Sequence, residues 1–173
     1  MRSMRFSIGA NVVALFLMGL TLNAGDQSGR GSSTPEVAAV THAVQEFMAA
    51  VAKDVSAQGP HAWRKYLSQE HAFFMASNGQ LVFESGEAAE QGIRALEQSI
   101  DHISLQWGQN LHVDPLSDTL AQVGVPFHET LVEKKGKQVS VDGYFTGLAQ
   151  HNDAGWQFRS AHWSVPPAAT VQH

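Results

Sequence analysis

The sequence predicts an α+β fold in which helices come first and an antiparallel sheet follows. Up to about residue 100, apolar residues recur at the spacing of amphipathic helices. After residue 102, apolar and polar residues alternate with a period of two, and turn residues divide this region into strand-length pieces. Helices followed by an antiparallel meander indicate that the helices cover one face of the sheet.

Three helical segments are predicted. The first starts at Thr34-Pro35-Glu36, where a capping hydroxyl, a proline and an acidic residue form a helix start. The second follows Gly59-Pro60, and the third covers residues 87–100. The first helix carries one apolar stripe that is expected to enter the core, formed by Val37, Val40, Val44, Phe47, Met48 and Val51.

The alternating region predicts a meander, preceded by a small hairpin around Ser77-Asn78-Gly79. Turns are expected at residues 134–137 and 152–155, where glycine and polar residues interrupt the alternation. The large apolar residues then fall on one face of the sheet, which should meet the helices. They are Trp107, Phe127, Phe145, Trp156 and Phe158.

The first 24 residues have the order of a secretory signal peptide. Arg2 and Arg5 accompany a mostly apolar run over residues 6–22, and Asn23-Ala24-Gly25 provides small residues for cleavage after Ala24. An uncleaved membrane anchor is the alternative, but the run is short for a bilayer core of ~30 Å. We therefore expect a protein that is exported, either periplasmic or secreted, with no stable membrane insertion after cleavage.

The rest of the chain divides into a spacer, one domain and a tail. Residues 25–34 are rich in glycine and serine and are expected to be flexible. The domain covers residues 35–166, and a proline pair at its end leads into a disordered tail over residues 167–173. A chain of 173 residues fits one such domain.

The composition excludes several classes of protein. The chain has 16 acidic and 11 basic residues, so it is not expected to bind nucleic acid. It contains no cysteine, which excludes disulfides, thiolate-bound zinc and iron–sulfur clusters. Pairs such as His112-x-Asp114 lack the spacing of a metal-binding helix motif, and no glycine-rich phosphate loop occurs. No metal and no cofactor are therefore expected.

The last predicted strand carries a pattern typical of a known family. A turn glycine, Gly155, precedes Trp156, Phe158 follows two residues later, and His162-x-Ser164 closes the strand. In these features the chain resembles the SnoaL-like branch of the NTF2-like superfamily, of the DUF4440 type.

The resemblance covers about residues 36–165, because Asp118–Ala121 and Gly143–Thr146 also resemble strands of this family. It implies an NTF2-like cone, in which N-terminal helices pack on a curved antiparallel sheet around a pocket. Members include isomerases, cyclases, dehydratases and proteins with no known reaction, and they commonly form dimers through the sheet. The resemblance therefore leaves the function open.

Strand alternation predicts which side chains line a pocket between the helices and the sheet. His162 and Ser160 have the parity of Phe158 and are therefore expected to point inward. An aromatic face with few polar groups is typical of a site for a small apolar ligand. The predicted ligand-binding residues are Trp63, Tyr66, Phe74, Trp107, Phe127, Phe145, Ser160 and His162.

Two of the inward-facing residues are candidates for catalysis. His162 could orient a ligand or transfer a proton near neutral pH, or it could be a buried histidine bonded to a hydroxyl or a carbonyl. Glu129 has the parity of Phe127, and an apolar pocket would raise the pKa of its carboxyl group. Alternatively, Glu129 lies in water beyond the rim of the sheet.

The opposite face of the sheet is expected to carry His128, Asp142, Tyr144, Arg159 and Trp163. His128 lies opposite Asp142 if the hairpin turn between them has three residues, as either a solvated pair or part of an interface. Tyr144 and Trp163 are large groups without an obvious cover, and with Arg159 they are predicted to form a homodimer interface.

Three functions follow from these features. The first is an exported protein that holds a small, mostly apolar ligand in its pocket, with no assigned reaction. The second is an acid–base enzyme of isomerase, dehydratase or cyclase type that uses His162 and Glu129 together. The third is a homodimerisation module. We rank them in this order.

Overall fold

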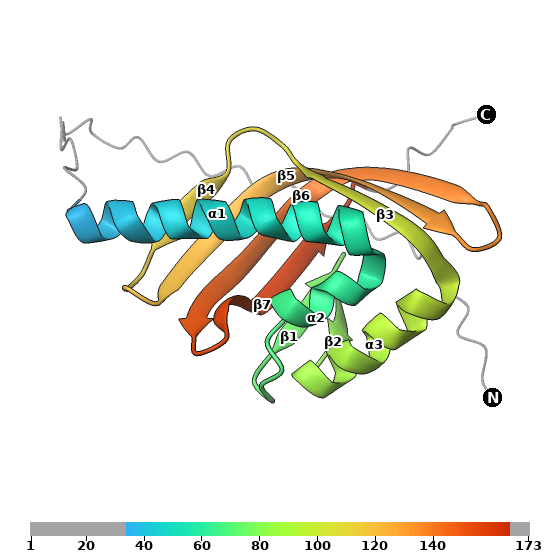
Figure 1. The fold of residues 1–173 in the computed structure, drawn as a ribbon, viewed down its shortest axis with the longest axis horizontal. Coiled ribbons are helices and arrows are strands. Elements are labelled where there is room, and N and C mark those ends of the chain that lie inside the picture. Colours follow the sequence, from blue (N-terminus) through green and yellow to red (C-terminus); the bar gives the residue numbers. More distant parts are fainter. Residues whose placement is uncertain (1–33, 167–173) are drawn as a thin grey trace, which may run out of the picture. The chain divides into compact units, whose positions relative to one another are not determined.

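A computed structural model describes residues 34–166 and has an α+β architecture (Figure 1). One long N-terminal helix lies across a curved, unclosed sheet of seven strands. The predicted fold class is therefore confirmed. The predicted signal peptide, the spacer up to residue 33 and the tail over residues 167–173 lie outside the described residues.

The long helix, α1 (Pro35–Gln58), begins where the sequence predicts. Thr34 Oγ1 accepts a hydrogen bond from Val37 N at 3.5 Å, and Gly59 ends the helix with a φ of 66°, a conformation that favours glycine. The apolar stripe enters the core except for Val37, which is 37% exposed. The buried residues of α1 are Val40, Val44, Phe47, Met48, Val51 and Val55.

Three shorter helical elements follow: the 3-10 helix η1 (Gly59–Ala62), α2 (Trp63–Tyr66) and α3 (Gly86–Ser99). Ser85 caps α3, because its hydroxyl accepts a hydrogen bond from Ala88 N at 3.1 Å. The amphipathic face of α3 buries Ala89 and Ile93.

The sheet has the strand order β2-β1-β7-β6-β5-β3, and β4 pairs with the other end of β5. All neighbouring strands are antiparallel except β1 and β7, which are parallel. The sheet is therefore mixed, where the sequence predicted a purely antiparallel one. The strands are β1 (Phe74–Ser77), β2 (Gln80–Phe83), β3 (Ile100–Trp107), β4 (His112–Pro115), β5 (Leu120–Glu133), β6 (Gln138–Asn152) and β7 (Gly155–Ser164).

Two side chains fix α1 to strand β3. Ser56 Oγ accepts a hydrogen bond from Leu105 N at 2.9 Å and donates one to Leu105 O at 3.2 Å. Trp107 Nε1 donates to Met48 O at 2.7 Å. These bonds define the concave face of the sheet, which is the face that α1 covers.

Strand β7 contains a β-bulge that the sequence analysis did not predict. Near the turn, Ala149 pairs with Phe158, but the next pair joins Leu148 to Ser160. Arg159 is the extra residue, and every later residue of β7 is displaced by one position relative to β6. Because side chains alternate between faces, this single insertion exchanges the two faces of β7 beyond Arg159.

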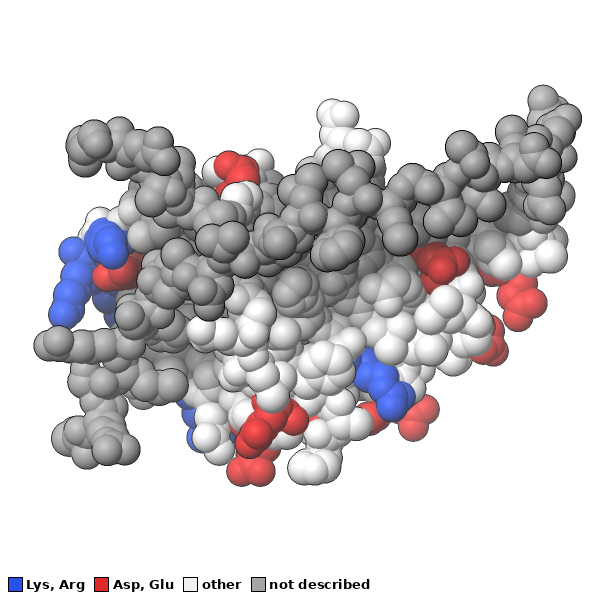
Figure 2. Space-filling model, turned by 180° about the vertical axis from the view of Figure 1, so that it is seen from behind, with Lys and Arg blue, Asp and Glu red and all other residues white. Residues whose placement is uncertain are grey.

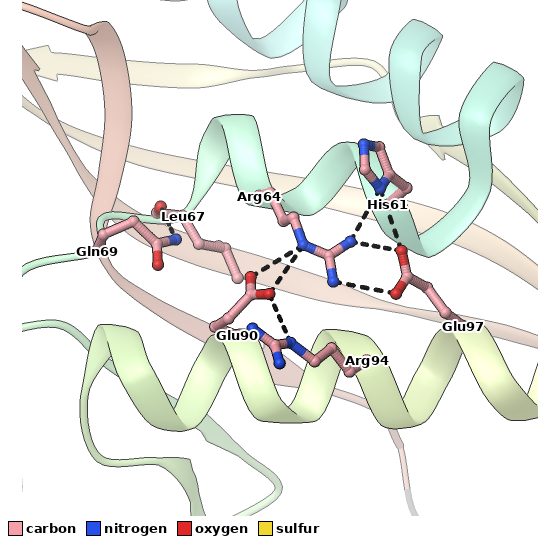
Figure 3. A network of polar contacts seen from close by, with 7 residues as sticks. All are labelled: His61, Arg64, Leu67, Gln69, Glu90, Arg94 and Glu97. Atoms are coloured by element: carbon pink, nitrogen blue, oxygen red, sulfur yellow. Dashed lines mark hydrogen bonds and ion pairs between the residues drawn. The ribbon is translucent and has the colours of Figure 1, made fainter.

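An ion-pair network joins α2 to α3 (Figure 3). Arg64 Nε donates to the two carboxylate oxygens of Glu90 at 3.1 and 3.0 Å, and its other two nitrogens donate to the two oxygens of Glu97. The Arg64 side chain is only 25% exposed. Glu97 raises the pKa of Arg64, and Arg64 in turn lowers the pKa of Glu97 to about 2.

We predict that Arg64→Ala destabilises the domain at neutral pH and that Arg64→Lys does so less, because lysine keeps the charge but not the planar fork. The folded-state pKa of Glu97 lies below its ordinary value of 4.5, so this stabilisation is present above pH 4.5 and is lost as the pH falls towards about 2. Urea denaturation at several pH values measures the effect. Arg94→Ala is the control, because Arg94 is 67% exposed and binds Glu90 alone. Equal stability of the wild type and Arg64→Ala at neutral pH would contradict the prediction.

Candidate functional site

The concave face carries a cluster of aromatic rings with Trp163 at its centre. The ring of Trp163 lies 4.6 Å from Phe127, 4.9 Å from Phe145 and 5.9 Å from both Trp63 and Trp107, measured between ring centres. These distances are typical of packed aromatic pairs. We call Trp63, Trp107, Phe127, Phe145 and Trp163 the aromatic cluster.

The bulge at Arg159 explains why the predictions for the end of β7 were wrong. His162 and Ser160, which were expected to point inward, lie on the opposite, convex face. Trp163, which was predicted at a dimer interface on the outer face, points inward instead. A signal was present in the sequence, because Trp156 and Phe158 are followed by apolar residues with the other parity at 161, 163 and 165.

The remaining predicted pocket residues fall into two groups. Trp63, Tyr66, Phe127 and Phe145 are buried within the core on the concave side, and Trp107 packs against that core. Phe74 is 49% exposed and pairs with Ser160, which places it on the convex face, so its assignment to the pocket was wrong.

The space expected for an enclosed ligand is filled by the rings of the aromatic cluster. Two surface hollows lie elsewhere among the described residues, and neither is lined by this cluster. The first, of about 310 Å³, lies between η1, the end of α3 and the β5–β6 turn, and the second lies between the start of α1 and the loop after β4. A ligand on the concave face must therefore bind beside the rings or displace one of them.

Glu129 lies on the concave face, as its parity predicted. It pairs with Leu105 on β3 and with Val141 on β6, and Phe127 precedes it on the same face of β5. Burial among these apolar neighbours raises the pKa of the Glu129 carboxyl group to about 7. No charge or hydrogen bond from the described residues contributes to this shift.

Glu129 is nevertheless only partly buried. Among the described side chains, no polar atom is both fully buried and without a hydrogen-bond partner, so the oxygens of Glu129 retain some contact with solvent. A carboxyl group with a pKa near neutrality is populated in both forms at pH 7. It can donate a hydrogen bond when protonated and accept one, or a proton, when ionised.

The predicted cooperation of His162 with Glu129 does not occur. The two residues lie on opposite faces of the same sheet, so they cannot act on one molecule bound at the concave face. The predicted acid–base enzyme that uses His162 and Glu129 together is therefore wrong about this residue pair.

We predict that Glu129→Gln stabilises the domain above neutral pH. The folded-state pKa of Glu129 is raised from 4.5 to about 7, so the stability of the wild type falls as the pH rises from 4.5 to about 7 and is level above that. The amide stays neutral throughout. The free energy of unfolding of the variant should therefore exceed that of the wild type by at most about 3 kcal/mol at high pH, and by nothing near the pH at which a free carboxyl ionises. Thermal denaturation across this range measures the difference.

The control for this prediction is Glu46→Gln, which removes a carboxylate that is 71% exposed on α1. This substitution should leave the dependence of stability on pH nearly unchanged. A Glu129→Gln variant with the same pH dependence as the wild type would show that the carboxyl group is well hydrated.

The convex face carries the predicted pair of His128 and Asp142. His128 Nδ1 lies 2.8 Å from Asp142 Oδ1, and the three-residue turn that this pairing requires is present. Tyr144 is 44% exposed beside this pair. Figure 2 views the molecule from behind and, among the described atoms, shows basic residues at one end and another basic group beside acidic residues elsewhere, with mostly uncharged residues between them.

Two kinds of feature are absent from residues 34–166. No three histidine, aspartate or glutamate side chains in this range come together as ligands for a metal ion. None of the helices in the same range is long and apolar enough to cross a membrane.

Comparisons with known proteins identify the fold. No family model and no curated protein matches the sequence. Among solved structures, an NTF2-like superfamily protein from Salmonella enterica serovar Typhimurium superposes with a TM-score of 0.64 at 13% identity, covering 79% of this chain and 97% of that one. The chain therefore has an NTF2-like fold, as the resemblance implied.

Two other similar structures have names that describe enzymes. A candidate scytalone dehydratase from Novosphingobium aromaticivorans has a TM-score of 0.65 at 12% identity, over 79% of this chain and 92% of that one. A hexachlorocyclohexane dehydrochlorinase, LinA type 2, has a TM-score of 0.59 at 12% identity, over 80% and 95%. At this identity the likeness concerns the fold, and the chemistry has to be argued from the side chains.

Proposed function

We propose that this protein binds a small, mostly apolar molecule on the concave face of its sheet, with Glu129 as the polar anchor. One observation carries the proposal: a carboxyl group without a partner among the described residues lies on an apolar face, where burial raises its pKa to about 7. An apolar surface with one well-placed polar group is the usual composition of a small-molecule site.

The energetics of the unliganded protein support this proposal. An ionised carboxylate among apolar residues is unfavourable unless it is paired, and Leu105 and Val141 provide no hydrogen-bonding side chain. A ligand with a carbonyl or hydroxyl group would supply the missing hydrogen bond. Such a ligand would also cover apolar surface of the aromatic cluster.

We propose that the N-terminal segment directs export and that the mature protein acts in the periplasm or outside the cell. In this proposal the protein binds its ligand and does not convert it. In this respect it would differ from the enzymes named among the structures of similar fold.

Acid–base catalysis by Glu129 alone is the second candidate function. It is favoured by the same carboxyl group, since a pKa of about 7 suits proton transfer at neutral pH. The enzymes named among the similar structures, a dehydratase and a dehydrochlorinase, are consistent with a site for elimination chemistry on this fold. This candidate requires turnover of a bound ligand, whereas the first requires binding only.

Acetophenone, an aromatic ketone, tests the proposed anchor. Its carbonyl can accept a hydrogen bond only from the protonated carboxyl group, so affinity should fall as the pH rises through about 7. Calorimetric titration of the wild type and of Glu129→Gln across this range measures the effect. The variant, whose amide donates at every pH, should bind with no such dependence. If acetophenone binds to the wild type at no pH within this range, the result counts against the proposed function.

We also propose that the convex face associates with a second copy of the chain. Tyr144 is 44% exposed there, and Phe74, on the same face, is 49% exposed. Arg159 belongs to this surface and Trp163 does not, because of the bulge. An exposed aromatic group on a sheet face with few charges is typical of a protein interface.

Substitution of Tyr144 tests this association. The wild type is expected to be a dimer at micromolar concentration, and Tyr144→Glu a monomer, since a carboxylate would be desolvated at the interface. Tyr144→Phe, the matched control, retains the ring and should remain dimeric. Sedimentation equilibrium measures the masses, and a monomeric wild type would exclude the interface.

A further inference from the structure

The side chain of Trp163 extends across the concave face. It belongs to β7, yet its ring is parallel to within 24° of the ring of Trp107 on β3, and the rings lie 5.9 Å apart. Two strands, β6 and β5, lie between these positions in the sheet. Trp163 therefore covers the middle of the sheet, where its ring also meets Phe127 and Phe145.

Trp163 differs from the inward-facing phenylalanine rings in its exposure and shares partial burial with Trp107. Phe145 and Phe158 are fully buried, whereas Trp163 is only partly buried. It is the second-last residue of β7, so the sheet ends beside it. The indole therefore forms the surface of the aromatic core that solvent reaches, and its removal would open space from outside.

Phe127 connects the Trp163 ring to Glu129 on the concave face. The centres of the Phe127 and Trp163 rings lie 4.6 Å apart. Glu129 follows Phe127 two residues later on the same face of β5, about 7 Å along the strand. No side chain at Gly143 intervenes on β6, where a Cβ atom would come within 2.6 Å of the Phe127 ring. The indole and the carboxyl group thus lie on either side of Phe127 on the same face of the sheet.

We propose that Trp163 determines which ligands the concave face accepts, by occupying the volume that the second ring of a bicyclic ligand would need beside Glu129. This inference rests on the proposed function. With Trp163 in place, the face accepts compounds with one ring, and without it the face accepts compounds with two fused rings. The residue thus sets the size of the ligand and takes no part in proton transfer.

A purely structural role for Trp163 leads to a different expectation. A tryptophan that only fills the core would leave, when truncated, a site that collapses or stays closed to ligands. A tryptophan at the border of a binding surface leaves an apolar cavity that is open to solvent and takes up molecules of matching shape. Ligand binding by the truncated variant separates these two roles.

The experiment compares Trp163→Ala with Trp156→Ala. Trp156 is a matched control, since it lies on the same strand, is also partly buried, and contacts His151 instead of the aromatic cluster. We measure the affinities for 2-acetylnaphthalene, which has two rings and a carbonyl, and for indole, which has two rings and no carbonyl. Trp163→Ala should bind both at least about tenfold more tightly than the wild type or the control does.

The outcomes are distinct. A folded Trp163→Ala that gains no affinity for either compound overturns the inference, as does an equal gain in Trp156→Ala. Absence of acetophenone binding to the wild type instead counts against the proposed function. If Trp163→Ala does not fold, Trp163→Leu replaces it. This variant should bind benzene more tightly than the wild type does, because leucine frees part of the volume of the indole, and no gain in benzene affinity likewise overturns the inference.

Discussion

The arrangement of the concave face depends on one unpaired residue, Arg159, in the last strand of the chain, β7. Arg159 takes no partner on β6, and the strand beyond it presents Ala161 and Trp163 to the helices. Without this bulge, His162 would occupy the centre of the aromatic cluster and the indole would lie outside. A backbone irregularity of one residue thus decides whether an imidazole or an indole lies at the centre of the cluster.

The sequence was sufficient to predict the helices and most of the strands, because each has a local signal, but it did not predict β4. It predicted the register of the β5–β6 hairpin on condition that the turn has three residues. The glycine at 136 marks a turn of defined length, and the pairing of His128 with Asp142 follows from it. The parallel pairing of β1 with β7 could not be predicted, since no local pattern records which distant strand lies alongside. The bulge changed the parity of one strand only, so Glu129 was placed correctly and His162 was not.

Glu129 shows how a site can be unfavourable for stability and still be retained in a fold. Its neighbours Leu105 and Val141 are suitable for a core, and a leucine at its position would be expected to pack among them without an electrostatic penalty. A titratable group in such surroundings is typical of functional sites rather than of structural ones. The aromatic cluster beside it provides a rigid wall, since each of its rings is held by others.

The parallel pairing of β1 with β7 has a consequence for how the chain reaches this structure. Phe74 pairs with Ser160, a residue about half the length of the chain away, and Ser68 N donates to Phe158 O at 3.0 Å. The residues after α2, including β1, can therefore make these contacts only after the last strand has been synthesised, and contacts so distant in sequence form slowly. Because of this dependence, β1 cannot join the sheet until the C-terminal strand β7 has been synthesised.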